Sequence, residues 1–220
     1  MTRSLAILVL LLGATFAGGC NILGFAGALE EQRRRTGKVW VDGVYNGLED
    51  QKVAVVVDAS NDIYATGGEE VVGAVLVEVI ARLVANAEAE SVVPAADIMR
   101  VLYDEPDLLD RTYDEVAARL GVDRLIVIQL DEFRLAEPGN QYVWSGQAAG
   151  NLLVIEADSY IEDDVRLEQY VNVTYPDRAN TTIDDLTAQV VALELLRRFA
   201  NRSSWFFYRH QERYPGYQEY

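Results

Sequence analysis

Residues 52–58 constrain the fold more than any other stretch of the sequence. They read Lys-Val-Ala-Val-Val-Val-Asp, an apolar run between two charged residues. A short run that is rich in valine and bounded by charge is typical of a strand buried on both faces of a sheet. The run therefore predicts a sheet covered by helices, and we expect it to be the central strand.

The sequence after this run predicts helices and strands in alternation. Thr66 and Glu69 form a capping box, so we expect a helix from Thr66 to about Asn86. Residues 91–93 form a short strand. Pro94 is suited to begin a second helix, because the first turn of a helix does not need its backbone N–H.

A third helix has signals at both ends. Thr112 and Glu115 form another capping box. Gly121 supplies the left-handed residue that commonly follows a helix, and Val116 and Leu120 are expected to face inward. These signals fix the bounds of the helix closely.

The second half of the chain predicts three strands and a closing helix. Residues 124–135 begin as a buried run, and residues 142–155 follow after a turn. Residues 165–175 alternate apolar and polar side chains, which is typical of a half-exposed antiparallel strand. Thr182 is expected to cap a last helix that continues toward the aromatic stretch 205–208.

Taken in order, the expected elements are β-α-β-α-α-β-β-β-α. Strands separated by a helix favour parallel pairing through a crossover, whereas strands joined by short turns favour antiparallel pairing. The order therefore predicts an α/β (α+β) fold, in which helices pack against a single mixed sheet.

The N-terminus has the three-part layout of a secretory signal peptide. Arg3 supplies a positive charge, residues 5–12 are an unbroken apolar run, and small residues dominate 13–19. The run is too short for a permanent membrane helix, which needs about 20 apolar residues. Residues 17–20, Ala-Gly-Gly-Cys, resemble the lipobox of bacterial lipoproteins, in which the chain is cleaved before the cysteine and the thiol is acylated.

Cys20, the only cysteine in the chain, is therefore the candidate lipid-attachment site. An ordinary signal peptide would leave an unpaired thiol in an oxidising compartment, whereas acylation consumes it. This interpretation divides the chain into a signal peptide at 1–19, a lipidated tether at 20–38 and a mixed α/β domain at 39–220. Asn21 is not the aspartate that retains some lipoproteins at the inner membrane. We therefore expect anchoring at the periplasmic face of the outer membrane, with the inner membrane as the alternative.

The charge of the chain limits its partners. The full sequence has a net charge of −16, and without residues 1–19 it has 18 basic and 35 acidic side chains, a net charge of −17. Such a surface repels the phosphates of nucleic acids and anionic lipid headgroups. Nucleic-acid binding is excluded, and contact with the lipid bilayer must come through acylated Cys20.

Few residues offer catalytic or metal-binding chemistry. His210 is the only histidine and has no nucleophile in a matching context, so we expect it at the surface or stacked on a ring. The acidic stretch 156–164 contains the carboxylates that Ca²⁺ prefers, but it lacks the ordered spacing of a calcium loop, which favours a solvated loop. The aromatic stretch 205–208 is a core element or a contact surface, and we expect core. The sequence predicts no catalytic residue, no cofactor and no metal site.

Three stretches, together with the order of elements, resemble a group of bacterial envelope lipoprotein domains. These stretches are 53–58, 113–130 (YDEVAARLGVDRLIVIQL) and 144–146 (Trp-Ser-Gly). The group includes the curli secretion lipoprotein CsgG, the penicillin-binding-protein activator LpoB and the N-terminal domain of TolB. In these domains a helix ending in a phrase like Leu-Gly-Val-Asp, here 120–123, precedes a strand. The resemblance covers roughly residues 50–210 at the level of pattern.

The resemblance implies a periplasmic binding or assembly module without catalytic residues. Its partner would be another envelope protein or a second copy of the chain. The alternative is an oligomeric secretion or channel component of the curli type. The sequence has no obvious long pair of alternating apolar strands of the kind that such a component inserts in the membrane.

Overall fold

A computed structural model describes most of the chain beyond its N-terminal part. The predicted signal peptide 1–19, the lipid-attachment site Cys20 and the tether up to residue 36 lie outside the described residues. The described ranges are 37–65, 68–140 and 142–213.

Contacts divide the chain into two compact units, of which the smaller contains a two-stranded antiparallel sheet. This sheet pairs β1 (Lys38–Val41) with β7 (His210–Arg213), and Gln211 lies opposite Trp40. The guanidinium of Arg209 lies over the Trp40 ring, 5.2 Å from its centroid. The sequence did not predict β7, because a run of four polar residues shows no strand pattern and forms a strand only through its pairing with β1.

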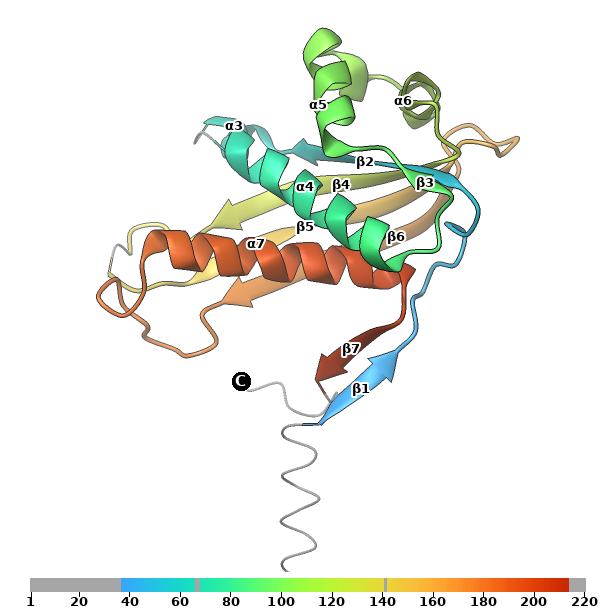
Figure 1. The fold of residues 1–220 in the computed structure, drawn as a ribbon. Helices are drawn as coiled ribbons and strands as arrows, with labels where there is room; N and C mark the ends of the chain where they lie inside the picture. Colours follow the sequence, from blue (N-terminus) through green and yellow to red (C-terminus); the bar gives the residue numbers. More distant parts are fainter. Residues whose placement is uncertain (1–36, 66–67, 141, 214–220) are drawn as a thin grey trace, which may run out of the picture. The chain divides into compact units, whose positions relative to one another are not determined.

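The larger unit, residues 42–208, contains a five-stranded mixed sheet (Figure 1). Its strand order is β3-β2-β4-β5-β6. β2 is parallel to both β3 and β4, whereas β5 and β6 are antiparallel to their neighbours. The predicted mixed sheet with packed helices is confirmed. The bounds are β2 (Lys52–Ala59), β3 (Ser91–Val92), β4 (Arg124–Arg134), β5 (Gly146–Glu156) and β6 (Val165–Tyr175).

The central strand is β4, so the prediction that residues 52–58 form the centre of the sheet is wrong. β2 has only the two-residue β3 on its outer side, whereas β4 lies between β2 and the long strand β5. The side chains from Val53 to Val57 are nevertheless at most 3% exposed. Helices bury β2 as fully as they bury β4, and an apolar run records burial but not position in the strand order.

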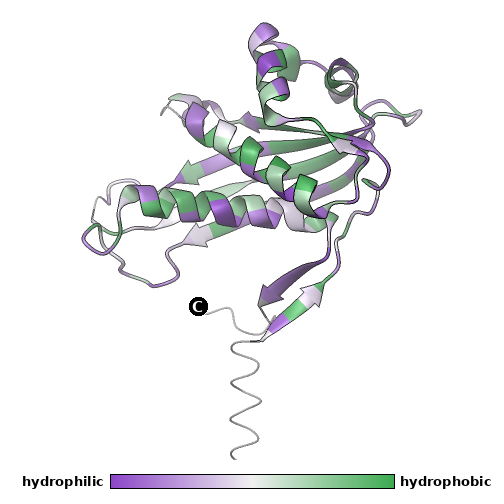
Figure 2. Ribbon diagram, in the orientation of Figure 1, coloured by the Kyte–Doolittle hydropathy of each residue, from purple (hydrophilic) through white to green (hydrophobic). Residues whose placement is uncertain are grey.

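Two long helices pack on one face of this sheet (Figure 1). They are α4 (Glu69–Asn86) and α7 (Ala188–Ser204), which lie side by side. Figure 2 shows largely hydrophobic strands near these helices, and Leu83 and Phe199 are among the fully buried side chains. Within the described residues, no helix is both long and apolar enough to cross a membrane.

Three shorter helical elements lie between β3 and β4 in the sequence, of which the first contacts β2 and the last contacts β4. They are α5 (Ala95–Asp104), the 3-10 turn η1 (Leu108–Asp110) and α6 (Tyr113–Leu120). Ile98 of α5 and Leu108 of η1 are fully buried. These elements extend the core beyond the layer formed by α4 and α7.

The predicted signals at the ends of α5 and α6 are confirmed. Pro94 precedes the first residue of α5. Thr112 Oγ1 accepts a hydrogen bond from the backbone N–H of Glu115 at 3.4 Å, and Gly121 ends α6 with a φ of 69°. Glycine adopts this left-handed conformation without the steric penalty of a side chain.

Two other helix starts differ from prediction. α4 begins at Glu69 with Gly68 as its N-cap and no side-chain cap, while Thr66 lies outside the described residues. A short helix that was not predicted, α3 (Asn61–Ala65), precedes it. α4 therefore begins later than the capping box predicts, and residues 61–65 form a separate helix.

The start of α7 also lies later than expected. Thr187 caps it, and Thr187 Oγ1 accepts from the N–H of Val190 at 3.4 Å. Thr182 instead binds Asp185 Oδ2 through both its N–H and its hydroxyl, each at 2.8 Å, which closes a local turn. Similarly, β5 begins at Gly146 and not at residue 142.

Gly150 is the position in β5 that we expect to tolerate substitution least. It faces an irregular point of β4, where the register shifts between Leu130 and Glu132. A Cβ at this position would lie 2.2 Å from the Gln129 carbonyl oxygen, so the backbone would have to move. Overpacking costs about 1–3 kcal/mol, and we expect Gly150→Ala to lower the free energy of unfolding by about 2 kcal/mol in denaturant titrations. Gly73→Ala in α4 is the control, because its added Cβ has no neighbour closer than 4.0 Å. An unchanged unfolding midpoint for Gly150→Ala would contradict the prediction.

Candidate interaction site at the β6 edge

β6 forms a long open edge of the sheet. Ten of its eleven residues pair with β5, while Arg166 lies at a register shift and has no partner there. Within the described part of the chain no strand follows β6 in the strand order. The other edge, β3, has two residues. An unpaired edge presents a row of backbone N–H and C=O groups that can accept another strand. β6 therefore offers the larger backbone surface for such pairing.

The composition of β6 favours strand pairing. Residues 169–175 (QYVNVTY) contain no charge, no proline and no glycine, and β-prone segments of this kind readily pair with other strands. Natural edges are usually protected by lysine, proline or inward-pointing charges. The charges of β6, Arg166 and Glu168, lie near its start. Arg166 already pairs with Glu156 at 3.1 Å and with Asp164 at 2.8 Å.

β6 has one packed face and one open face. Val171 is buried, and Leu167 and Val173 pack against the core on the same face. Tyr170 and Asn172 are exposed on the opposite face, where Tyr170 is 61% exposed. The predicted half-exposed antiparallel strand is confirmed.

Tyr170 belongs to a polar row that crosses four strands. The cross-strand register aligns one residue from each of β2, β4, β5 and β6: Asp58, Gln129, Asn151 and Tyr170. Directly opposed residues project from the same face of a sheet. Gln129 Nε2 donates to the Tyr113 hydroxyl at 3.0 Å, and partial desolvation together with the charge of Asp110 raises the pKa of Asp58. The open face next to β6 is therefore rich in hydrogen-bonding groups.

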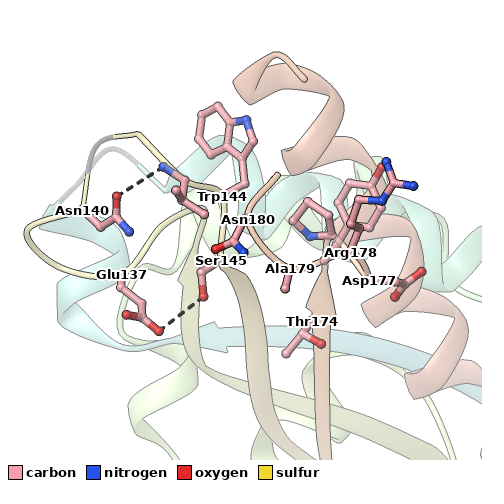
Figure 3. A pocket seen from close by; sticks show the side chains of 13 residues that line it. Glu137, Asn140, Trp144, Ser145, Thr174, Asp177, Arg178, Ala179 and Asn180 are labelled. Atoms are coloured by element: carbon pink, nitrogen blue, oxygen red, sulfur yellow. Dashed lines mark hydrogen bonds between the residues drawn. The ribbon is translucent and has the colours of Figure 1, made fainter. Parts of the chain in front are cut away.

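A cleft lies at the C-terminal end of β6 (Figure 3). It consists of two hollows of about 410 and 560 Å³, and both are lined by residues 175–178 and Asn180. Figure 3 shows Arg178 and Asn180 on the segment after β6, while Glu137 and Asn140 come from the loop before β5.

Backbone hydrogen bonds join the two segments that line this cleft. Trp144 donates its N–H to the Thr181 carbonyl at 2.9 Å and its indole Nε1–H to the Leu186 carbonyl at 2.9 Å. The N–H of Ile183 donates to the Tyr142 carbonyl at 3.2 Å. The cleft therefore has walls that are fixed to each other.

Arg198 of α7 fixes the end of β6. It donates to Asp177 Oδ2 at 2.8 Å and to the Thr174 carbonyl at 2.9 Å, and its guanidinium lies 4.7 Å from the Tyr175 ring centroid. Its Nε also donates to Glu194 at 3.1 Å. The hydrogen bond to Asp177 is the main cause that raises the pKa of Arg198, against the opposing effect of desolvation. Arg198 therefore stays charged and neutralises the acid beyond the strand.

Arginines bind the first acids of the stretch 156–164. Arg124 is 8% exposed, forms an ion pair with Asp158, and has its Nε 3.7 Å from Glu156 Oε1. Desolvation lowers the pKa of Arg124, but the hydrogen bond to Asp158 and the neighbouring negative charges outweigh it and raise the pKa. Part of this stretch is thus an ion-pair network and not a solvated loop. In the described ranges, no group of three histidine, cysteine, aspartate or glutamate residues is placed to hold a metal ion.

The described aromatic residues near the C-terminus of the larger unit belong mainly to the core. Phe207 is buried, and its ring meets that of Tyr45 edge-on with centroids 6.2 Å apart. Phe206 and Tyr208 pack against the same core cluster. The core interpretation of the stretch 205–208 is confirmed for these three residues.

Of the two positions expected for His210, at the surface or stacked on a ring, the surface position is wrong. It lies in β7, is 8% exposed, and its Nε2 is 3.0 Å from Glu212 Oε1. Its polar surroundings in the sequence suggested exposure, but pairing with β1 makes this segment part of a sheet.

The sequence did not predict the open edge of β6, nor the ion pairs that Arg198 and Arg124 form. Arg198 and Asp177 are distant in sequence, and the local signal for Arg198 was Glu194, one helical turn earlier on the same helix face. Arg124 resembles any charged residue at the start of a strand until its burial is known. The predicted lipid-attachment site, Cys20, lies outside the described residues.

Comparisons with known proteins give distant similarities of structure. No family model matches the chain, and no curated protein matches its sequence significantly. A PelC dodecamer from Paraburkholderia phytofirmans is similar over 79% of this chain and 98% of its own, with 12% identity and a TM-score of 0.45. Lipoprotein GNA1162 from Neisseria meningitidis is similar over 66% and 92%, with 9% identity and a TM-score of 0.44.

The C-terminal domain of LpoB from Salmonella enterica is also similar. The match covers 66% of this chain and 90% of that domain, with 9% identity and a TM-score of 0.33. At these identities the similarity concerns the fold alone.

Proposed function

We propose that this chain is a lipoprotein anchored through acylated Cys20, whose mixed α/β domain faces the periplasm and binds envelope proteins or copies of itself. The signal-peptide layout and the lipobox-like residues 17–20 support the anchor. Asn21 supports the outer membrane as its location. The proposal assigns the domain no catalytic role.

The open edge of β6 is the observation that carries this proposal. A partner strand added there would pair with the backbone groups of β6 that β5 and Arg198 do not already bind. Alternate side chains would then decide which strand is accepted. The uncharged segment 169–175 makes pairing possible without burying an ion.

The surroundings of β6 support a binding surface that is already formed. Arg198 holds the end of the strand through Asp177 and Thr174. Arg166, at the other end, is held by Glu156 and Asp164. A strand whose ends are fixed loses little conformational freedom on binding, which favours affinity.

Site-specific photo-crosslinking in intact cells tests the proposal. A photoreactive amino acid at Asn172, on the exposed face of β6, is expected to give a discrete crosslinked species that contains an envelope protein or a second copy of the chain. The matched control is Tyr103 of α5, which is 85% exposed and not part of the sheet. If both positions give the same products, or if Asn172 gives none, the β6 edge is not a binding surface. A ladder of many copies from Asn172 would instead favour the channel-type assembly.

A further inference from the structure

We propose that β6 pairs with β6 of a second copy of this chain, antiparallel and about a two-fold axis at Tyr170. This inference rests on the proposed function and names the partner for the β6 edge. Tyr170 is the midpoint of Val165–Tyr175, and a two-fold axis there pairs the regular segment 167–173 with its copy. Two five-stranded sheets would become one continuous sheet.

The alternation of β6 is compatible with this register. In antiparallel pairing about Tyr170, each residue meets a partner that lies equally far on the other side of Tyr170. Even-numbered residues therefore meet even-numbered ones, and the exposed face of one copy continues into the exposed face of the other. On the packed face, Leu167 would lie opposite Val173. A slip by one residue would place packed positions beside exposed ones, which the two-residue period of a strand opposes.

The charges of β6 also fit a second copy. In the same register Glu168 lies opposite the uncharged Asn172. Arg166 stands at the register shift near the start of β6, beyond the regular segment, so no like charges face each other across that segment. Just beyond the strand, Asp177 is neutralised by Arg198.

Because the chain is strongly acidic, the balanced charge of β6 matters for contact between two copies. Two copies with a net charge of −17 repel each other at long range, and contact requires a surface without excess acid. β6 carries one basic and one acidic residue, so it supplies such a surface. Paired tyrosines at Tyr170, each 61% exposed in the single chain, would add ring contact at the axis.

Single-cysteine crosslinking of the full mature chain tests this geometry. Cys20→Ala removes the only cysteine, so each new cysteine reports alone. Tyr170→Cys lies on the proposed axis and is expected to form a homodimeric disulfide at least roughly ten-fold faster than Tyr103→Cys, because pairing raises the effective concentration of the two thiols. Native mass measured at increasing protein concentration is expected to show a dimer.

The register has its own readout. Glu168→Cys and Asn172→Cys lie opposite each other across the proposed pair, so a mixture of the two variants is expected to give the mixed disulfide in preference to either homodimer. Equal amounts of all three products would contradict the register. Both variants replace exposed side chains on the open face, so we expect both proteins to fold normally.

The outcomes separate this inference from the proposed function. If Tyr170→Cys reacts no faster than Tyr103→Cys, while photo-crosslinking at Asn172 captures another envelope protein, self-pairing is wrong and the binding function stands. If neither experiment gives a product, both are wrong. A native mass of many copies would overturn the two-fold pair, because a two-fold contact closes at two copies.

Discussion

Replacing Cys20 with alanine is expected to transfer the protein from the membrane fraction to the soluble fraction. Buried acyl chains contribute about 0.8 kcal/mol per CH₂, so several chains on one cysteine hold a protein that has no other affinity for lipid. The charge of −17 gives the mature surface no attraction to anionic headgroups. The variant is expressed with a cleavable secretory signal in place of residues 1–19, because an uncleaved apolar leader would itself retain it. Cell fractionation and immunoblotting provide the measurement.

A matched variant and a mass measurement complete this test. Asn21→Ala keeps Cys20 and its native leader, and it should remain with the membranes. The N-terminal peptide of the native protein should begin at Cys20 and carry the mass of acyl chains. A Cys20→Ala protein that still sediments with membranes, or an unmodified Cys20 in the native protein, would show that the lipid anchor is wrong.

Replacing Arg124 with alanine is expected to lower the free energy of unfolding by about 3 kcal/mol, since removing one partner of a buried ion pair costs about 3–5 kcal/mol. Arg124 forms an ion pair with Asp158 and donates to the carbonyls of Gly47 at 3.1 Å and Asp123 at 2.8 Å. Glu156, 21% exposed at its side chain, would lose a neighbouring cation. The expected value is at the lower end of the range because Asp158, 53% exposed, can be rehydrated.

Denaturant unfolding followed by circular dichroism, in the Cys20→Ala background, measures this loss. Arg166→Ala is the matched control, since its side chain is 49% exposed and also pairs with Glu156. Exposed ion pairs contribute about 0–1 kcal/mol, so its unfolding midpoint should move little. If the two substitutions lowered the free energy of unfolding equally, burial would not be the reason why Arg124 stabilises the fold.

Local sequence patterns predicted correctly those helices and strands whose signal, an alternation of side chains or a cap, involves only residues close together in the sequence. The alternation at 165–175 gave β6 because a strand exposes every second side chain. Thr112 and Gly121 gave the ends of α6 because a capping hydrogen bond and a left-handed residue are local features. A local signal was misleading at Thr182, which was predicted to cap a helix. Its hydroxyl instead donates a hydrogen bond to Asp185 and closes a turn.

The candidate site depended on the order of the strands, which no local pattern contains. Residues 53–57 of β2 and residues 125–128 of β4 are both continuous apolar runs, yet β4 is central and β2 has only β3 outside it. In the same way, the alternation at 165–175 showed that one face of β6 is open, but not that one of its edges is open as well. The tertiary structure decided this, because an edge is defined by which strand is absent beside it.

The sequence by itself determined the expected location of the protein, at a membrane, and one class of partner that it is not expected to bind, nucleic acid. Residues 17–20 predict the anchor, and the excess of acidic side chains excludes nucleic acid, because processing signals and net charge do not depend on the fold. The tertiary structure decided which surface is free to bind. It brought Arg198 to Asp177 and Arg124 to Asp158, and it left β6 at the edge, because contacts between residues distant in sequence form only when the chain packs.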